Sequence, residues 1–168
     1  MNSKEKIKNA FIDILQYKDI NDISITYIVK KANINRSTFY NNFTSINDLI
    51  ECIREEMFNN IINLYKDESE TMKHSYDYLK LFNHIYNNQK YYKTLFKLNF
   101  DFSNYYDYNL EKEESIKYYK NINNMDYHIE FFKAGISAII KKWLNNNCDK
   151  TPSEMVNIIK EEYMSKNI

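Results

Sequence analysis

Glycine and proline are nearly missing from this chain of 168 residues, which has one of each, Gly135 and Pro152. Glycine supplies the positive φ angles that tight hairpins and phosphate-binding loops require, and proline interrupts helices. Glycine-rich nucleotide loops and sets of β-hairpins are therefore excluded, and helices remain. We expect an all-α fold of about nine helices, with the size of one domain or of two small helical subdomains.

The composition supports a folded chain with no strong overall charge. Hydrophobic residues make up 43% and aromatic residues 16%, which is enough apolar area for a core. Lysine plus arginine and aspartate plus glutamate number 23 each, so the total charge favours neither nucleic acid nor membrane. Residues 1–50, however, hold seven basic and five acidic side chains, a net +2 that leaves −2 elsewhere. This asymmetry favours a DNA contact near the N-terminus.

The reactive side chains do not form a catalytic or metal-binding pattern. Cys52 and Cys148 lack CxxC spacing, and His74, His84 and His128 lack the paired spacing of metal ligands. No Ser-His-Asp, Cys-His or paired-carboxylate grouping is placed together by the sequence, so we expect no enzyme, no catalytic residue, no metal and no cofactor. No apolar run approaches the roughly 20 residues that cross a bilayer, so we expect a soluble, cytoplasmic protein without membrane contact.

Helical periodicity and capping residues divide the chain into helices. The sequence predicts helices over about 4–17, 25–31, 45–66, 73–87, 88–100, 125–144 and 152–165, with a short helix after Asn35 and another that carries Tyr118 and Tyr119. Ser24 and Asn35 are predicted N-caps, and Ser45-x-x-Asp48 and Thr151-Pro-Ser-Glu154 resemble capping boxes. We place a DNA-binding domain over 1–46 and a regulatory and dimerisation domain over 47–168.

Residues 24–41 fit a helix-turn-helix, a pair of short helices of which the second enters the major groove of DNA. Asn33 lies in the turn, where asparagine tolerates the left-handed conformation. The pattern alone leaves open a plain solvated helical hairpin. If it binds DNA, the polar side chains that reach phosphates and base edges are Thr26, Asn35, Arg36, Ser37, Thr38, Tyr40 and Asn41.

The segment from Ile25 to Phe43 resembles the helix-turn-helix of the TetR/AcrR family of bacterial transcriptional regulators, and the likeness covers about the first 55 residues. It implies that Phe39 packs inward, that Tyr40 reaches the phosphate backbone and that Phe43 is buried. The chain departs from the family pattern at three positions. Asn33 replaces a glycine, Asn42 replaces a histidine or tyrosine, and Asn47 replaces a lysine that touches phosphate.

The segments 132–144 and 151–155 more loosely resemble the C-terminal domain of a subgroup from low-GC Gram-positive bacteria, which includes regulators like the activator of dihydroxyacetone kinase operons. This resemblance implies a homodimer formed by the last two helices. Glycine inside a helix costs roughly 1 kcal/mol relative to alanine, so its presence at Gly135 indicates a packing reason, such as the close approach of another helix. The predicted interface residues are Phe131, Gly135, Ala138, Lys142, Val156, Ile159 and Tyr163.

Aromatic residues at helical spacing in the C-terminal part are mostly expected in the core, and some could line a ligand cavity. The predicted pocket residues are Tyr78, Phe82, His84, Tyr86, Phe96, Tyr119, His128 and Phe131. A solvated or purely structural histidine is the alternative at His84 and His128.

These observations predict a homodimeric regulator, a repressor by the family default, that binds a near-palindromic double-stranded DNA operator. An unknown small-molecule effector or protein partner would shift the population between two conformations and so change operator affinity. The main alternative is a co-regulator of the same fold that is switched through protein–protein contacts instead of a small molecule.

Overall fold

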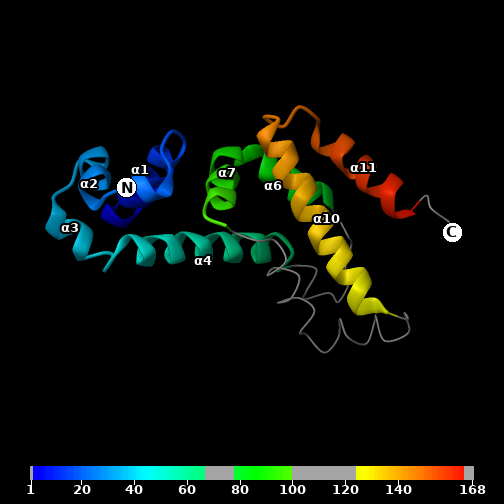
Figure 1. The fold of residues 1–168 in the computed structure, drawn as a ribbon, viewed down its shortest axis with the longest axis horizontal. Helices are drawn as coiled ribbons and strands as arrows, with labels where there is room; N and C mark the ends of the chain where they lie inside the picture. The colour runs from blue at the N-terminus through cyan, green and yellow to red at the C-terminus, as the bar shows by residue number, and fades with distance from the viewer. Residues whose placement is uncertain (1, 67–77, 100–123, 165–168) are drawn as a thin grey trace. The chain divides into compact units, whose positions relative to one another are not determined.

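All secondary structure in the described part of the chain is helical, in a computed structural model that describes residues 2–66, 78–99 and 124–164. Eight α-helices and one 3₁₀ turn, Ile20–Asp22, occur there, and these residues contain no strand (Figure 1). The all-α prediction is confirmed. The helices are α1 (Ser3–Leu15), α2 (Ile25–Ala32), α3 (Arg36–Tyr40), α4 (Ile46–Leu64), α6 (Tyr78–Asn87), α7 (Gln89–Lys97), α10 (Met125–Asn145) and α11 (Pro152–Met164).

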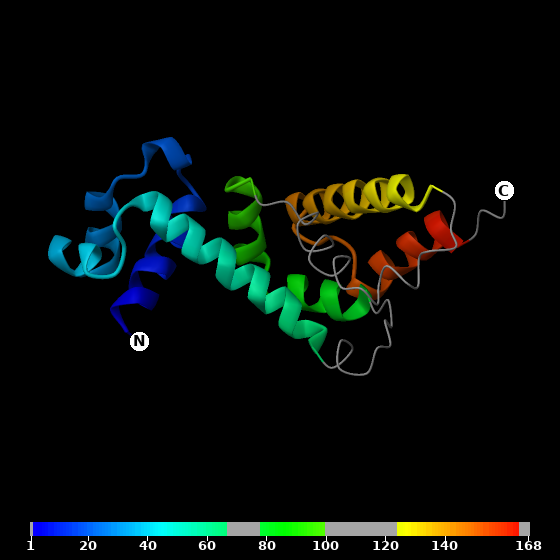
Figure 2. The same cartoon turned by 90° about the horizontal axis from the view of Figure 1, so that it is seen from below.

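The chain divides into two compact units. The first consists of Met1–Asn59 and Lys90–Phe100, and the second of Asn60–Gln89 and Asp101–Ile168. Helix α4, one unbroken helix in Figure 2, begins in the first unit and ends in the second. The predicted functional boundary between residues 46 and 47 stays a prediction. The predicted helix around Tyr118 and Tyr119 lies outside the described residues.

The core of the first unit is built from one apolar face of α1. Ile7, Phe11, Ile14 and Leu15 are completely buried on this helix, at the i, i+4, i+7 spacing of a single face. Burying each such side chain contributes about 1.5–3 kcal/mol. The other helices of the unit each add fully buried side chains to this core, which are Ile28, Phe39, Leu49, Ile53, Tyr92 and Leu95.

A charged side chain also lies in this unit, between α1 and α4. Lys8 is only 6% exposed, and its ammonium group pairs with Glu5 at 2.6 Å and with Glu56. Burial alone would lower the pKa of Lys8, but the hydrogen bonds and charges of the two carboxylates outweigh it and raise this pKa. The lysine therefore stays charged and links the two helices.

The second unit is organised around an aromatic cluster on α6 and α10. The indole of Trp143 meets the ring of Phe82 edge-on, with 5.4 Å between centroids, and stacks with Tyr86 at 6.2 Å. Its Nε1 donates a hydrogen bond of 2.9 Å to the carbonyl of Lys150. Helix α11 packs against α6. The tryptophan thus fixes both the α6–α10 packing and the loop that leads into α11.

The start of α11 is the capping box that the sequence predicts. The backbone N–H of Glu154 donates to Thr151 Oγ1 at 3.3 Å, and the carboxylate of Glu154 accepts from the backbone N–H of Thr151 at 2.7 Å. Pro152 is the first residue of the helix, where no backbone N–H is required. These hydrogen bonds to Thr151 lower the pKa of Glu154.

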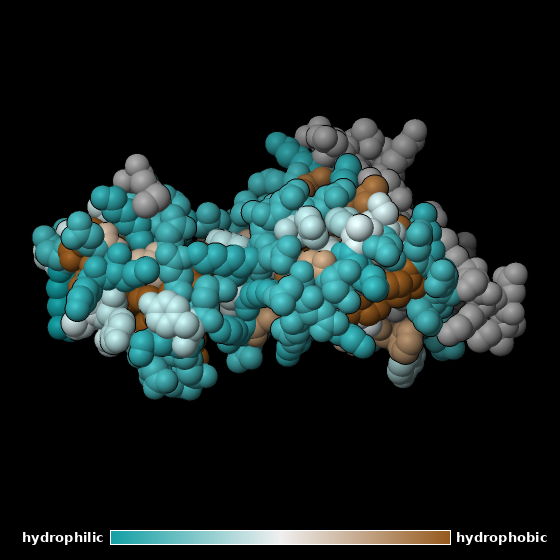
Figure 3. Space-filling model, turned by 90° about the horizontal axis from the view of Figure 1, so that it is seen from above, coloured by the Kyte–Doolittle hydropathy of each residue, from teal (hydrophilic) through white to brown (hydrophobic). Residues whose placement is uncertain are grey.

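The surface shown in Figure 3 is mostly hydrophilic with separate hydrophobic patches. Among the described residues, the two most exposed large hydrophobic side chains are on α10, where Tyr127 is 73% exposed and Phe131 is 72% exposed. No helix in the described part of the chain is long and apolar enough to span a membrane.

Candidate nucleic-acid interface

The α2–α3 pair has the geometry of a helix-turn-helix, and its turn depends on one residue. Asn33 ends α2 in the left-handed conformation, with φ 52° and ψ 53°. The following N–H, that of Ile34, returns to the carbonyl of Val29 at 3.1 Å and closes the end of the helix. The asparagine therefore takes the conformation that the usual glycine would take at this place, as the sequence predicts.

Helix α3 is held by one buried ring. Phe39 is completely buried, and its ring lies 6.0 Å from that of Phe43, which is 2% exposed. The next residue, Tyr40, is 47% exposed. The predicted burial of Phe39 and Phe43 is confirmed. Since α3 has five residues, this anchor determines which of its side chains face solvent.

The face of the α2–α3 pair that is open to solvent carries the predicted DNA-contact residues. Six of these side chains are exposed and Thr38 is half-buried. They come from the first turn of α2 and from α3 with its two caps. The exposed ones are Thr26, Asn35, Arg36, Ser37, Tyr40 and Asn41. Their contact with DNA stays a prediction.

Asn35 fixes the first turn of α3 through its side-chain oxygen. Oδ1 accepts hydrogen bonds from the backbone N–H of Thr38 and from the hydroxyls of Ser37 and Thr38, each at 2.7 Å. The first of these is the N-cap bond that the sequence predicts, and such a cap contributes about 1 kcal/mol. The two hydroxyl bonds add order to the side chains around it.

Two cations in this region lie over aromatic rings. The guanidinium of Arg36 lies 5.9 Å from the ring centroid of Tyr40, one helical turn further on, and Lys18 Nζ lies 4.6 Å from that of Tyr27. Both contacts keep a positive charge close to the exposed face. Lys18 and Tyr27 are not among the predicted contact residues, because they are on different segments and no spacing rule links them.

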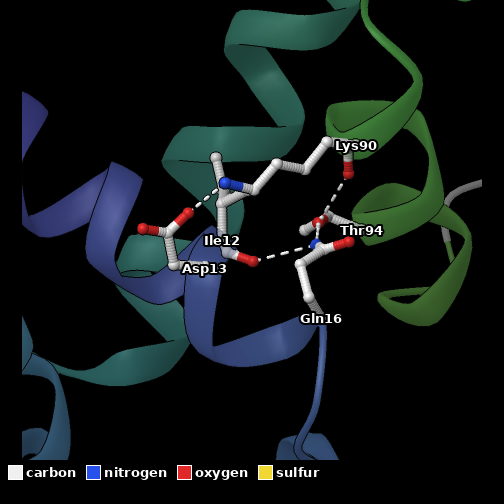
Figure 4. A network of polar contacts seen from close by, with 5 residues as sticks. All are labelled: Ile12, Asp13, Gln16, Lys90 and Thr94. Atoms are coloured by element: carbon white, nitrogen blue, oxygen red, sulfur yellow. Dashed lines mark hydrogen bonds and ion pairs between the residues drawn. The ribbon is translucent and has the colours of Figure 1, made fainter.

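A set of polar contacts joins the last turn of α1 to α7 (Figure 4). Gln16 Nε2 donates to Thr94 Oγ1 at 2.9 Å and to the carbonyl of Ile12 at 2.9 Å, and Lys90 pairs with Asp13. One turn further along α7, Lys97 donates to the carbonyl of Leu15.

Positions 90, 94 and 97 follow the i, i+4, i+7 spacing, so these three side chains of α7 share one helix face. We call this group of contacts the α1–α7 clasp. It lies in the same unit as α2 and α3, and a helix from the middle of the sequence thereby becomes part of that unit.

The predicted ligand-pocket residues are divided between the two compact units. Phe96 belongs to the first unit, whereas the other described members belong to the second. Phe82 is completely buried against Trp143, and burial lowers the pKa of the half-buried His84. His128 and Phe131 are exposed, and Tyr119 lies outside the described residues. The aromatic cluster has a packing role at Phe82, and a ligand pocket stays a prediction.

The predicted dimer residues divide between exposed and buried positions. Phe131, Ala138 and Lys142 are exposed on α10, while Gly135 and Val156 are partly buried. Ile159 is 2% exposed and contributes to the core of its own chain. The surroundings of the Tyr163 side chain lie outside what the structure describes. The dimer interface stays a prediction.

Comparisons with known proteins point to regulators of transcription. Residues 75–162 match the model of a TetR-type family described as "Transcriptional regulator C-terminal region". The HTH-type dhaKLM operon transcriptional activator DhaS of Lactococcus lactis is 27% identical over 164 residues, which is 91% of this chain and 86% of that protein.

Two solved structures share the fold. The dihydroxyacetone kinase operon activator DhaS superposes with a TM-score of 0.62 at 24% identity, covering 95% of both chains. A TetR transcriptional regulator from Streptococcus agalactiae superposes with a TM-score of 0.64 at 23% identity, covering 93% of this chain and 90% of the other.

Proposed function

The chain belongs to the TetR family of transcriptional regulators, which are not enzymes, and from this premise we propose that it binds a specific DNA operator as a homodimer through α3. One observation carries the proposal. Helix α3 buries Phe39 on one side, and the stretch from Asn35 to Asn41 exposes mainly side chains that can form hydrogen bonds. Side chains of these types are the ones that donate to phosphates and read base edges.

Dimer formation is supported by α10. Its most exposed aromatic residues, Tyr127 and Phe131, are four positions apart and share a face with the exposed Ala134 and Ala138. An apolar helix face of this kind gains free energy when a second copy covers it. A two-fold dimer would present two copies of α3, so the operator would be a near-palindrome with half-sites about 34–36 Å apart.

A conformational change in the second unit would reach the DNA-binding unit through α4 and α7, because a boundary between the two units falls in each of these helices. Helix α4 begins in the first unit and ends in the second, and α7 follows the second-unit helix α6 directly. A ligand or protein that prefers one conformation of the second unit would change the placement of α4 and α7, and through the α1–α7 clasp that of α1. Effector identity, and the choice between a small molecule and a partner protein, belong to this proposal.

The direction of control has two candidates. Repression, the family default, follows when the bound dimer blocks RNA polymerase. Activation is favoured by the name of the curated relative, a transcriptional activator of an operon. Deletion of the gene raises transcription of the operator-linked genes in the first case and lowers it in the second, so transcript quantification separates the two.

An electrophoretic mobility shift with the DNA that flanks the gene itself tests the core of the proposal. The regulator is expected to retard one fragment at nanomolar to tens of nanomolar protein, in the range of specific protein–DNA complexes. An excess of unrelated DNA should not remove this band. A protein that acts only through other proteins would leave all fragments unshifted.

A further inference from the structure

Asparagine is the side chain that reads adenine in the major groove, and three asparagines lie on or next to α3. Reading adenine takes both ends of the amide, because the oxygen accepts from the N6 amino group while the NH₂ donates to N7. An asparagine whose oxygen is already used inside the protein cannot do this. The hydrogen bonds of the three asparagines therefore distinguish what each one offers to DNA.

The side-chain oxygen of Asn35 is fully occupied by hydrogen bonds within the protein. Its Oδ1 accepts from the backbone N–H of Thr38, which fixes the orientation of the amide because an NH₂ group cannot accept there. The hydroxyls of Ser37 and Thr38 also donate to this oxygen, and an amide oxygen has two lone pairs for these three donors. Only the NH₂ group remains, so Asn35 can approach DNA as a donor and nothing else.

The side-chain amide of Asn42 is held by its NH₂ group instead of by its oxygen. Its Nδ2 donates to the carbonyl of Thr38 at 2.7 Å, and the side chain is half-buried. This bond turns the amide back toward α3. Asn42 therefore acts within the helix and not on its outer face.

Asn41 keeps both ends of its amide available. It is exposed at the C-cap of α3, its backbone N–H donates to Ser37 at 2.9 Å, and its side chain makes no hydrogen bond to any residue that the structure describes. Asn41 is four positions after the exposed Ser37, so these two side chains lie on the same exposed face.

We propose that Asn41 reads one adenine in each half-site of the operator, and that Asn35 meets DNA only by donating from its NH₂ group to an acceptor. The proposal rests on the function given above and specifies its chemistry. The acceptor for Asn35 is a phosphate oxygen or an acceptor atom of a base, which share the same chemistry. Asn41 then contributes sequence specificity, and Asn35 contributes position and the helix cap.

The test uses the full-length protein and an operator duplex selected from a random double-stranded DNA pool. Each adenine of one half-site is replaced in turn by purine, which lacks the N6 amino group, and by 7-deazaadenine, which lacks N7. At one adenine, both replacements are expected to weaken wild-type binding about tenfold. Asn41→Ala should lose about tenfold on the unmodified duplex and lose nothing further on either analogue at that position.

Two matched variants complete the test. Asn42→Ala and Asn35→Asp, which keeps the capping oxygen but loses the NH₂ group, should both retain full sensitivity to the two analogues. Asn35→Asp should also bind less tightly to every duplex, and a methylphosphonate linkage that abolishes this difference identifies a phosphate as its acceptor, whereas 7-deazaguanine identifies a base.

Three results would overturn the proposal. They are an Asn41→Ala variant that stays sensitive to the adenine analogues, a half-site in which no adenine responds, and an Asn35→Asp variant that has lost the response. The first two remove Asn41 as the reader while leaving operator binding intact. Selection that yields no preferred sequence would instead reject the proposed function itself.

Discussion

Gln16 Nε2 donates a hydrogen bond of 2.9 Å to Thr94 Oγ1, which joins two residues 78 positions apart in the sequence. Thr94 is completely buried, and its hydroxyl donates a hydrogen bond of 2.9 Å to the carbonyl of Lys90. The hydroxyl thus accepts from α1 and donates within α7 (Figure 4). A buried group that is satisfied in both roles fixes the register of the two helices.

Replacing Thr94 by valine keeps the shape of the side chain and removes both hydrogen bonds. We expect Thr94→Val to lower the free energy of unfolding by about 1–2 kcal/mol, since each net hydrogen bond contributes about 1 kcal/mol. Thr94→Ser should restore most of the loss because serine keeps the hydroxyl. Equilibrium urea unfolding measures the difference, and equal midpoints for wild type and Thr94→Val would contradict the role of the α1–α7 clasp.

The capping box of α11 gives a second prediction. Thr151→Ala removes the hydroxyl that accepts from the N–H of Glu154, and it should lower the free energy of unfolding by about 1 kcal/mol. Ser153→Ala, at an exposed position of the same turn, is the control and should change little. Thermal unfolding by circular dichroism compares them. Identical melting temperatures for both variants would show that the box contributes nothing.

The pH dependence of stability tests the environment of His84. Because burial lowers the pKa of His84 in the folded protein, the unfolded chain binds the proton more readily. This contribution to stability is complete above the unfolded pKa of about 6.5 and is lost as the pH falls below it. Melting temperatures between pH 7.5 and 5.5 should therefore decrease.

The matched variants separate His84 from other groups that titrate in this range. The decrease should be smaller in His84→Gln, while exposed His128 replaced by glutamine should behave as wild type. A wild-type slope in His84→Gln would assign the effect to other groups.

Local contacts are the part of the fold that the sequence made predictable. The caps at Ser24, Asn35 and Thr151 each join residues three apart, so the pattern of residue types is sufficient to locate them. The left-handed turn at Asn33 is equally local. The α1–α7 clasp was not predictable, because its partners meet only after the helices have packed.

The candidate site shows the same division. The resemblance to the TetR/AcrR helix-turn-helix predicted that Phe39 packs inward, and Phe39 is buried next to an exposed Tyr40. The contact of Lys18 with Tyr27 and the occupied oxygen of Asn35 depend on side-chain positions that no spacing rule gives. The sequence was therefore sufficient to predict which face of the α2–α3 pair is exposed. The geometry is needed to say which hydrogen-bond donors and acceptors each side chain has available.

Dimer formation is predicted to depend on the exposed aromatic face of α10. Phe131→Lys places a charge on this face, so it should shift the protein toward the monomer at micromolar concentration. His128→Gln, an exposed change on the same helix, is the control and should leave the assembly unchanged. Sedimentation velocity distinguishes the two states. A monomeric wild type, or a Phe131→Lys variant that dimerises normally, would reject this interface.

Footprinting of the DNA that flanks the gene, with wild type and Arg36→Ala side by side, tests most directly that α3 binds a specific operator. We expect two protected half-sites about one helical turn apart, related by sequence symmetry. Arg36→Ala should lose about 1–3 kcal/mol in binding free energy if this side chain reads a guanine. A single asymmetric site, or strong protection that ignores sequence and is unchanged in Arg36→Ala, would contradict specific operator binding by α3.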